Sequence, residues 1–320
     1  MALVVQWAQE HGQVGGVLTS HTQLSRRLRD EGHEVRYVDT GSLRRAVRAA
    51  PALATRPALH LFHITRLWRA IILAPVFAVL PGRTVLVLHS GSTTRQVRDM
   101  GGPMRAVLNL ALHAYDELWT VNDEIRAVLP EGLAGRAVVV VPFDDTFQPG
   151  LDVMAHDAHA LALATNAGLA HYNAELGLDA ARLVRRKWPD ATIHILAYGN
   201  DGPALDRLRE QVRGEAWVTI TFDLPAAATS EVLQRVGCFL RPTSWDGDSL
   251  IVREALASGA RVVASDRAPR PRGVELAPLD ASGLATVVLE GGPVSDGAGL
   301  AERTMAQAAD AAMDRLERMT

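Results

Sequence analysis

The residues best suited to chemistry lie in one segment, residues 241–259, with the sequence RPTSWDGDSLIVREALASG. Asp246, Gly247, Asp248 and Ser249 form a turn with helix-capping side chains, and the apolar residues that follow recur at helical spacing. A helix is therefore predicted to begin where a strand ends. Free N–H groups and the helix dipole make such a helix start an anion site, and nucleotides bind there in open α/β sheets. The turn is predicted to hold a diphosphate.

Two carboxylates bracket this turn, with seven residues between them. Asp246 precedes the predicted helix, and Glu254 lies about a turn and a half inside it. This spacing allows both side chains to face one cleft.

The segment resembles the retaining GT-B glycosyltransferases of family four, which carry two glutamates with seven residues between them in a Pro-Ser-x-x-Glu-Gly setting. The matching positions are Pro242, Thr243, Asp246, Gly247, Glu254, Ala255, Ala257 and Gly259, followed by Val262, Val263, Ala264, Ser265 and Asp266. The resemblance implies that Asp246 lies beside donor-sugar hydroxyls and that Glu254 binds the ribose. It also implies that N–H groups face the sugar and phosphates from Gly247, Asp248, Ser249, Leu250 and Ile251.

Three further segments agree with this resemblance. Gly15 and Gly16 follow the first predicted strand, where the family has a Gly-Gly loop that lines the cleft; the alternative is a simple turn at a helix start. His89 follows a strand at the place where many members have a histidine that reaches the donor sugar, although a histidine there can equally be satisfied locally. Gly199 lies in residues 198–203, YGNDGP, which resemble the family's Gly-x-Gly-Pro turn.

One departure concerns the clamp for the donor phosphates. Most members have an Arg and a Lys after the first strand of the second domain, whereas residues 165–176, TNAGLAHYNAEL, contain neither. Helix N–H groups, His171 or an arginine from elsewhere would have to neutralise the diphosphate. The alternatives are a catalytically reduced GT-B-like subunit that binds a nucleotide sugar or a partner transferase, and a nucleotide-sugar epimerase on the same fold.

A competing interpretation takes Asp246 and Asp248 as the Asp-x-Asp metal motif of the other glycosyltransferase fold. It leaves Glu254 without a role. We therefore expect no metal, and no cofactor apart from the nucleotide diphosphate-sugar as co-substrate.

Short β-rich apolar runs alternate with helical stretches along the chain, which predicts an α/β fold with parallel sheets. The resemblance makes this GT-B: two Rossmann-like, doubly wound domains facing a cleft. Strands are predicted at residues 3–7, 34–38, 59–65, 84–89, 117–121, 138–141, 161–165, 192–198, 218–222, 238–241 and 261–264.

Turn-forming residues in the segment 142–150, PFDDTFQPG, separate the two strand series and predict an interdomain linker. We expect an acceptor-side domain over residues 1–148 and a nucleotide-sugar domain over residues 149–299. The alanine-rich pattern of residues 300–320 predicts a final helix that can cross back to the first domain.

Composition favours a packed enzyme, with 48% hydrophobic and 22% charged residues. Cys238 is the only cysteine, which excludes an internal disulfide and a cysteine-held zinc. The first residues have no signal-peptide pattern, and the longest apolar run, residues 70–80, falls short of the roughly 20 residues that span a bilayer. We therefore expect a cytoplasmic protein.

The net charge is only −3, but residues 41–110 contain ten arginines against the single acid Asp99. This excess is either a solvated surface from a biased genome, since Lys187 is the only lysine, or a surface that attracts anionic lipid or a diphosphate-bearing acceptor. Peripheral contact with the inner membrane face would follow from the second alternative. Nucleic acid is not expected, because no binding module accompanies the charge. The predicted function is a metal-independent, retaining hexosyltransferase that acts on a glycan, glycolipid or small-molecule acceptor, as in polysaccharide biosynthesis.

Overall fold

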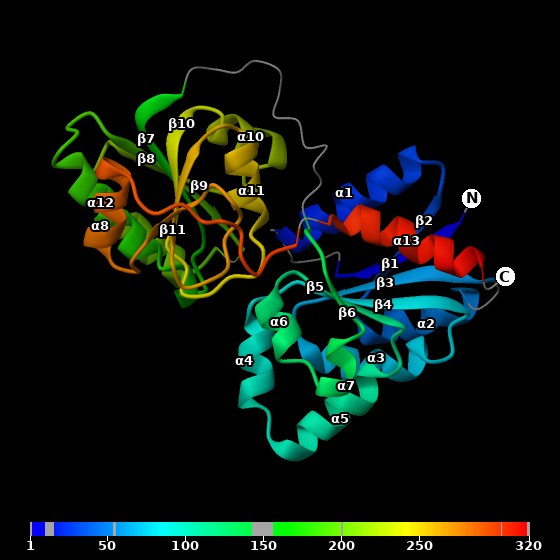
Figure 1. Cartoon of the computed structure of the whole chain (residues 1–320). Helices are drawn as coiled ribbons and strands as arrows, with labels where there is room; N and C mark the ends of the chain where they lie inside the picture. Colours follow the sequence, from blue (N-terminus) through cyan, green and yellow to red (C-terminus); the bar gives the residue numbers. More distant parts are fainter. Residues whose placement is uncertain are drawn as a thin grey trace. The chain divides into compact units, whose positions relative to one another are not determined.

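A computed structural model describes residues 2–9, 16–53, 56–142, 156–199, 201–301 and 303–318. The chain forms two compact units: unit 1 is Met1–Asp145 together with Gly299–Thr320, and unit 2 is Thr146–Ala298 (Figure 1). The boundary expected after residue 148 lies in residues 143–155, outside the described residues. Each unit has one six-stranded sheet in which all the paired strands are parallel, which confirms the α/β class.

The sheet of unit 1 has the strand order β2-β1-β3-β4-β5-β6. Its strands are β1 (Leu3–Ala8), β2 (Glu34–Asp39), β3 (Ala58–Ile64), β4 (Gly82–Leu88), β5 (Glu117–Thr120) and β6 (Ala137–Val139). Its helices are α1 (Gly16–Asp30), α2 (Leu43–Leu53), α3 (Leu67–Phe77), α4 (Ser92–Asp99), α5 (Gly102–Leu112), α6 (Asp123–Ala127), α7 (Glu131–Ala134) and α13 (Met305–Glu317).

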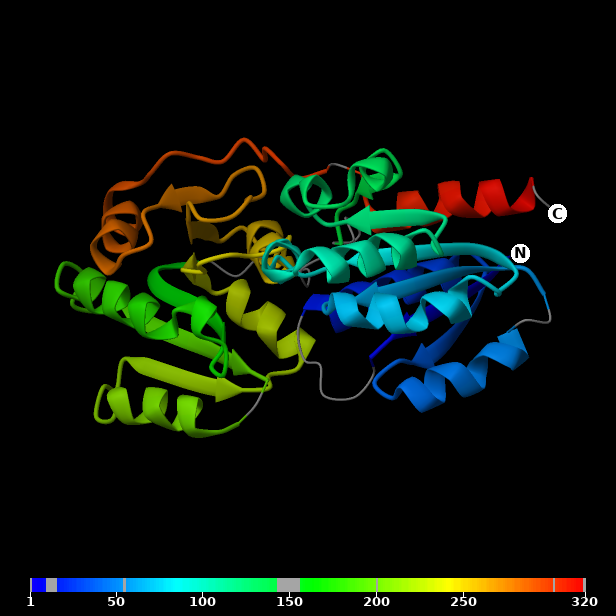
Figure 2. The same ribbon diagram turned by 90° about the horizontal axis from the view of Figure 1, so that it is seen from below.

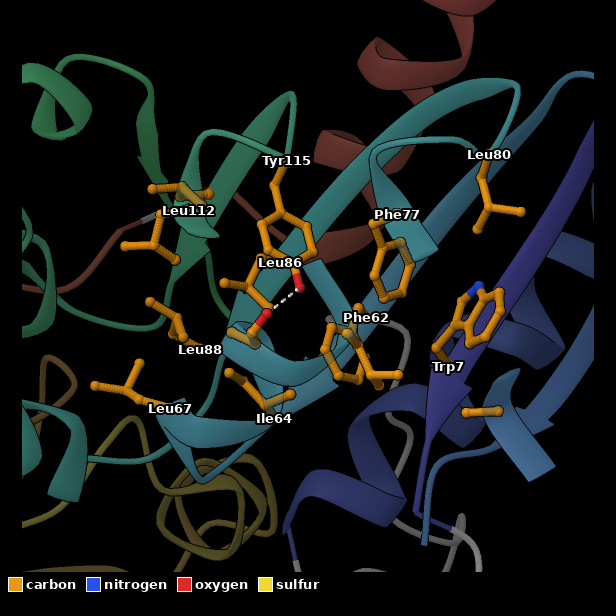
Figure 3. Packing of buried hydrophobic residues seen from close by; sticks show 14 of the residues in the cluster. Trp7, Phe62, Ile64, Leu67, Phe77, Leu80, Leu86, Leu88, Leu112 and Tyr115 are labelled. Carbon is orange, nitrogen blue, oxygen red and sulfur yellow. Dashed lines mark hydrogen bonds between the residues drawn. The ribbon is translucent and has the colours of Figure 1, made fainter. Parts of the chain in front are cut away.

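One face of this sheet packs under α2, α3 and α5, because the strands present large apolar side chains at every second position. Trp7, Phe62, Phe77 and Tyr115 meet there (Figure 3). The hydroxyl of Tyr115 donates to the carbonyl oxygen of Ala70 at 2.9 Å, so this buried polar atom has a partner. This core holds β1, β3 and β4 in place, and with them the polar residues near their carboxyl ends, Gln6, His63 and His89.

The other face packs under α1 and α13, which lie side by side (Figure 1). In the view from below, α2, α3 and α5 lie in front of the sheet (Figure 2). The small side chains of Ala309 and Ala312, both fully buried, let α13 approach the strands closely. Thr304 caps α13 in a reciprocal arrangement with Gln307, and Arg315 lies 2.5 Å from Glu117 of β5. The last helix therefore belongs to the core of unit 1.

The sheet of unit 2 has the order β12-β11-β10-β7-β8-β9. Its strands are β7 (Asp157–Asn166), β8 (Thr192–Tyr198), β9 (Val218–Phe222), β10 (Val236–Arg241), β11 (Arg261–Ser265) and β12 (Glu275–Ala277). Helices α8 (Ala174–Arg185), α9 (Pro203–Gln211) and α12 (Ala281–Glu290) cover one face. Helices α10 (Ala226–Leu233) and α11 (Leu250–Ala257) cover the other, and a short 3₁₀ turn, η1, spans Ala170–Tyr172.

Each predicted strand is present, and the predicted final helix is α13. The prediction missed β12, which has only three residues and therefore too little sequence to show a pattern. The apolar run at residues 70–80 lies largely in α3 and the turn after it. Among the described residues, no helix has the length and apolar character that a bilayer crossing requires.

Candidate functional site

The predicted turn lies at the point in unit 2 where the strand order reverses. The first strand of the unit, β7, has β8 on one side and β10 on the other, and crevices for ligands open at the carboxyl ends of such strands. Arg241 ends β10, and the turn of residues 242–249 leads from it into α11. The segment with the two carboxylates is therefore placed at this edge of the sheet.

Asp246 is held by two buried arginines. Arg241 donates from Nε to Oδ2 at 2.8 Å and from Nη2 to Oδ1 at 3.2 Å. Arg270, from the loop after β11, donates from Nη1 to Oδ2 at 3.0 Å. The Thr243 hydroxyl and the Gly247 N–H also donate to this carboxylate. Its hydrogen-bonding capacity is filled by the protein.

This arrangement keeps Asp246 ionised. Burial opposes the charge, but Arg241 and Arg270 hold the pKa of its carboxyl well below the usual range. The Asp246 side chain is 13% exposed, whereas those of Arg241 and Arg270 are 4% and 1% exposed. The carboxylate that the resemblance places beside sugar hydroxyls is thus part of a buried ion-pair cluster.

Asp248 has a separate partner. Arg253 donates from Nε to Oδ1 of Asp248 at 2.7 Å, and burial raises the pKa of this carboxyl. Both acids of the Asp-x-Asp pattern therefore contact guanidinium groups. Within the ranges that the structure covers, no three His, Cys, Asp or Glu side chains group as metal ligands would.

The start of α11 is open to a ligand. Ser249 occupies the N-cap position, but its side chain makes no capping hydrogen bond, contrary to the predicted helix-capping role. Its carbonyl instead accepts from the N–H groups of Val252 and Arg253. The N–H groups of Leu250 and Ile251 have no acceptor in the described part of the chain. These two donors, with the helix dipole behind them, suit an anion.

Glu254 projects from the same helix and is partly buried. Its carboxylate makes no hydrogen bond or ion pair with the residues that the structure describes. Burial raises the pKa of Glu254 to about 7. A carboxyl group whose pKa lies near 7 and which has no partner among the described residues is a candidate for contact with a ligand.

The loop after β7, where the family clamp is missing, is tied to the turn. Asn173, in the left-handed region with φ 49°, donates from its amide to the Pro242 carbonyl at 2.8 Å and to the Ser244 hydroxyl at 2.9 Å. His171 stacks on Trp245 with ring centroids 3.6 Å apart. Burial lowers the pKa of His171 to about 4, so it is neutral at pH 7. It therefore adds no positive charge for a diphosphate.

Tyr172 contacts Arg241, and Tyr198 contacts Tyr172. The guanidinium of Arg241 lies 4.8 Å from the ring centroid of Tyr172, at cation–π distance. The hydroxyls of Tyr172 and Tyr198 lie 2.5 Å apart. Next to Tyr198, Gly199 has φ +94°, and a Cβ there would lie 2.5 Å from Nδ2 of Asn166. The positive φ therefore favours glycine at this position.

The remaining predicted residues belong to unit 1. His89 follows β4 and is 9% exposed, and Gly16 is the exposed first residue of α1. Gly15 lies outside the described residues. The structure thus brings together the residues from Asp246 to Glu254 in unit 2, with Gly199 at the end of a strand in the same sheet.

Sequence reasoning missed the roles of Arg241 and Arg270. Arg241 ends an otherwise apolar strand, VGCFLR, and a charged residue in that position is a signal of a buried ion pair. Arg270 lies in a loop rich in arginine and proline, and nothing in its local sequence distinguishes it from Arg267 or Arg272.

No family model matches the chain, and no curated protein matches it either. Among solved structures, HepE from Anabaena, in complex with UDP and glucose, shares 12% identity over 98% of this chain and 97% of its own, with a TM-score of 0.66. Sucrose-phosphate synthase from Thermosynechococcus elongatus shares 16% identity over 98% and 94%, with a TM-score of 0.65. TarM shares 12% identity over 82% of this chain, which spans 50% of the TarM chain, with a TM-score of 0.57. The two parallel-sheet units and these likenesses together show that the chain has the two-domain GT-B fold.

Proposed function

We propose that the protein is a retaining glycosyltransferase that moves a hexose from a nucleotide diphosphate-sugar to a glycan, glycolipid or small-molecule acceptor. The observation that carries the proposal is the start of α11, where the Ser249 side chain makes no capping hydrogen bond and Glu254 has no partner among the described residues. The fold supports it, since HepE was solved with UDP and glucose. In this proposal the donor diphosphate binds at Leu250 and Ile251, and Glu254 accepts hydrogen bonds from the ribose.

The net charge of the ion-pair cluster formed by Arg241, Asp246 and Arg270 favours an anionic ligand. Arg241 and Arg270 carry two positive charges and Asp246 one negative charge, which leaves one net positive charge. Charges buried in a medium of low dielectric act over longer distances than charges in water. The cluster thus contributes some of the positive potential that the missing Arg and Lys supply in the resembling family.

We further propose that no metal and no other cofactor take part. The carboxylates of Asp246 and Asp248 are both paired with arginines, and a divalent cation would have to displace these partners. The helix start would instead neutralise the leaving diphosphate. Turnover that is unchanged by a chelator is the expected result, and loss of turnover that Mg²⁺ or Mn²⁺ restores would contradict this part of the proposal.

A second candidate function is a subunit that binds a nucleotide sugar without transferring it. The saturated carboxylate of Asp246 favours this alternative, because it has no capacity left for a sugar hydroxyl. The loop after β7, which has no basic clamp, favours it as well. Nucleotide binding without release of nucleoside diphosphate in the presence of acceptors would identify this function.

We also propose a peripheral contact of unit 1 with an anionic membrane surface, on the inner face if the protein is cytoplasmic. Helices α3 and α5 pack together, and large apolar side chains on them are exposed: Trp68, Ile72, Met104, Val107 and Leu110. All five lie within the arginine-rich segment of residues 41–110. Apolar side chains with arginines nearby suit a lipid headgroup region.

Vesicle flotation tests this contact. Binding to vesicles with about 30% phosphatidylglycerol, weak binding to pure phosphatidylcholine and loss of binding in Leu110→Glu are expected. Val294→Glu, which changes an exposed apolar residue of unit 2, is the control that should bind normally. Equal recovery of all three proteins with both vesicle types would contradict the contact.

Calorimetry with UDP, ADP and GDP tests the donor site. One nucleotide should bind, and Glu254→Gln should weaken it about tenfold or more, as expected from the loss of a charged hydrogen bond. Glu290→Gln, at an exposed position on α12, is the matched control and should leave the affinity unchanged. Binding that is equally tight in both variants would place the nucleotide elsewhere.

A further inference from the structure

Polar residues lie near the carboxyl ends of three strands of unit 1, on the same face of the sheet: Gln6 in β1, His63 in β3 and His89 directly after β4. Side chains alternate along a strand, so Gln6 shares a face with Val4, His63 with Leu61, and His89 continues the face of Val87. The apolar members of this alternation pack in the cluster under α1 and α13. The polar residues therefore lie together at the carboxyl edge, where β1 and β3 form the reversal point of the strand order.

These side chains form a chain of hydrogen bonds. Nε2 of His63 lies 2.5 Å from Oε1 of Gln6, and Nδ1 of His63 lies 2.8 Å from Nε2 of His89. Gln6 and His63 are 0% and 3% exposed. His21 of α1 packs over them, with its ring centroid 5.6 Å from that of His63. This row of hydrogen bonds begins at the fully buried Gln6 and ends at His89, which is 9% exposed.

The direction of the hydrogen bonds follows from the chemistry of the groups. An amide oxygen only accepts, so Nε2 of His63 carries the hydrogen. A neutral imidazole has one N–H, and Nδ1 of His63 is therefore an acceptor for Nε2–H of His89. Burial keeps the rings neutral, since it lowers the pKa of His89 to about 3 and that of His63 well below the usual range. His89 is left with an unprotonated Nδ1.

That nitrogen has no hydrogen-bond partner in the parts of the chain that the structure describes. A neutral ring with a free lone pair accepts a hydrogen bond from a hydroxyl and repels an anionic oxygen. His89 therefore selects a hydroxyl over a phosphate or carboxylate oxygen.

We propose that Gln6 and His63 are positioning residues that fix the tautomer of His89, so that its Nδ1 accepts a hydrogen bond from a sugar hydroxyl of the substrate. The nature of the hydroxyl rests on the proposed transferase function, whereas the tautomer does not. His60 provides the internal contrast. It lies on the same strand but on the opposite face, and its Nδ1 accepts from Nε1 of Trp7 at 3.2 Å inside the core.

NMR of the protein with ¹⁵N-labelled histidine tests the tautomers without any substrate. Signals of His63 and His89, assigned with His63→Asn and His89→Asn, should both show protonated Nε2 and unprotonated Nδ1 at pH 7.5. A hydrogen on Nδ1 of His89 would mean that the Gln6 amide donates, and it would overturn the proposal.

Kinetics test the positioning role. His63→Leu removes the acceptor for His89 and should lower kcat/KM about tenfold or more. His63→Asn keeps an oxygen near the former Nδ1 position and should stay within about threefold of the unchanged protein. His60→Leu is the matched control: it is equally buried on the same strand and should retain kcat/KM once the folded fraction is measured. Equal losses in His63→Leu and His60→Leu would reduce His63 to a structural residue and overturn the proposal.

The two proposals fail in different ways. Protonated Nε2 on both rings with no transfer to any acceptor would refute the transferase and leave the tautomer assignment standing. Full transfer with Nδ1–H on His89 would refute the positioning role and leave the transferase standing.

Discussion

Arg241 and Asp246 form a two-point ion pair at the carboxyl end of β10, with Nε 2.8 Å from Oδ2 and Nη2 3.2 Å from Oδ1. The pair joins the last residue of the strand to the turn before α11. Because Arg270 binds the same carboxylate from the loop after β11, one acid connects the ends of two strands. The turn is thus shaped by buried charge.

The first prediction concerns Asp246→Asn. This change leaves Arg241 and Arg270 buried without a counter-charge, and removal of one partner from a buried ion pair costs about 3–5 kcal/mol of unfolding free energy. Urea unfolding of the variant and of Asp266→Asn, an acid on the exposed surface, measures the difference. A cost below about 1 kcal/mol for Asp246→Asn would show that the cluster does not hold the turn.

The second prediction concerns the pH dependence of Glu254. Its pKa in the folded protein, about 7, lies above the ordinary value of 4.5, so its contribution to stability is full below pH 4.5 and falls as the pH rises towards 7. Glu254→Gln should match the unchanged protein near pH 4.5 and exceed it by roughly 1–3 kcal/mol at pH 8. Thermal unfolding of both proteins at the two pH values measures this difference.

The third prediction concerns acid sensitivity in unit 1. Burial lowers the pKa of His21 and His60 to about 4, below the ordinary 6.5, and it lowers those of His63 and His89 as well. The unfolded chain binds protons that the folded one does not, so stability is full above pH 6.5 and falls as the pH drops towards 4. Each histidine should contribute about 1.4 kcal/mol per pH unit in this window.

Urea unfolding at pH 7.5, 6 and 5 measures that slope. His60→Asn should lower this slope by about 1.4 kcal/mol per pH unit, because one ring that titrates between these pH values is removed. A stability that stays level between pH 7.5 and 5 would show that these rings are not buried in the neutral form.

The fourth prediction concerns α13. Ala312→Asp places a carboxylate at a fully buried position against the sheet and should cost more than about 3 kcal/mol of unfolding free energy. Asp314→Ala, at an exposed position on the same helix, should change it by less than about 0.5 kcal/mol. Similar small effects in both variants would remove α13 from the core of unit 1.

The fold could be predicted from the sequence because its signal is repeated. Strands such as β4 are short and rich in apolar residues, and helical stretches follow them. This alternation of strands and helices recurs in both units. The strand β12 was missed because three residues carry no periodicity. The place of the turn at residues 242–249 was likewise predictable, since turn residues follow a strand and precede a helix.

The contacts of the site could not be predicted in the same way. The sequence shows Asp246 and Glu254 as equivalent acids around a turn, but their surroundings come from distant segments. Arg270 reaches Asp246 from 24 residues further along the chain, whereas none of the described residues pairs with Glu254 in this way. The sequence also contains no sign that Gln6 and His63, 57 residues apart, form a row of hydrogen bonds with His89. Such pairings join segments that are far apart in the sequence, and local patterns do not encode which segments meet.

The place of α13 has a consequence for the order in which the chain folds during synthesis. Its residues leave the ribosome after all of unit 2, yet Met305, Ala309 and Met313 complete the apolar cluster on one face of the first sheet. Domains generally fold as they emerge from the ribosome. Unit 2 can therefore fold while one face of the sheet of unit 1 is still exposed, because α13 has not yet been made. Such an unfinished surface is a natural target for a chaperone. A nascent chain whose residues 1–298 have all left the exit tunnel while α13 is still inside it should hold a folded second unit and an incomplete first one.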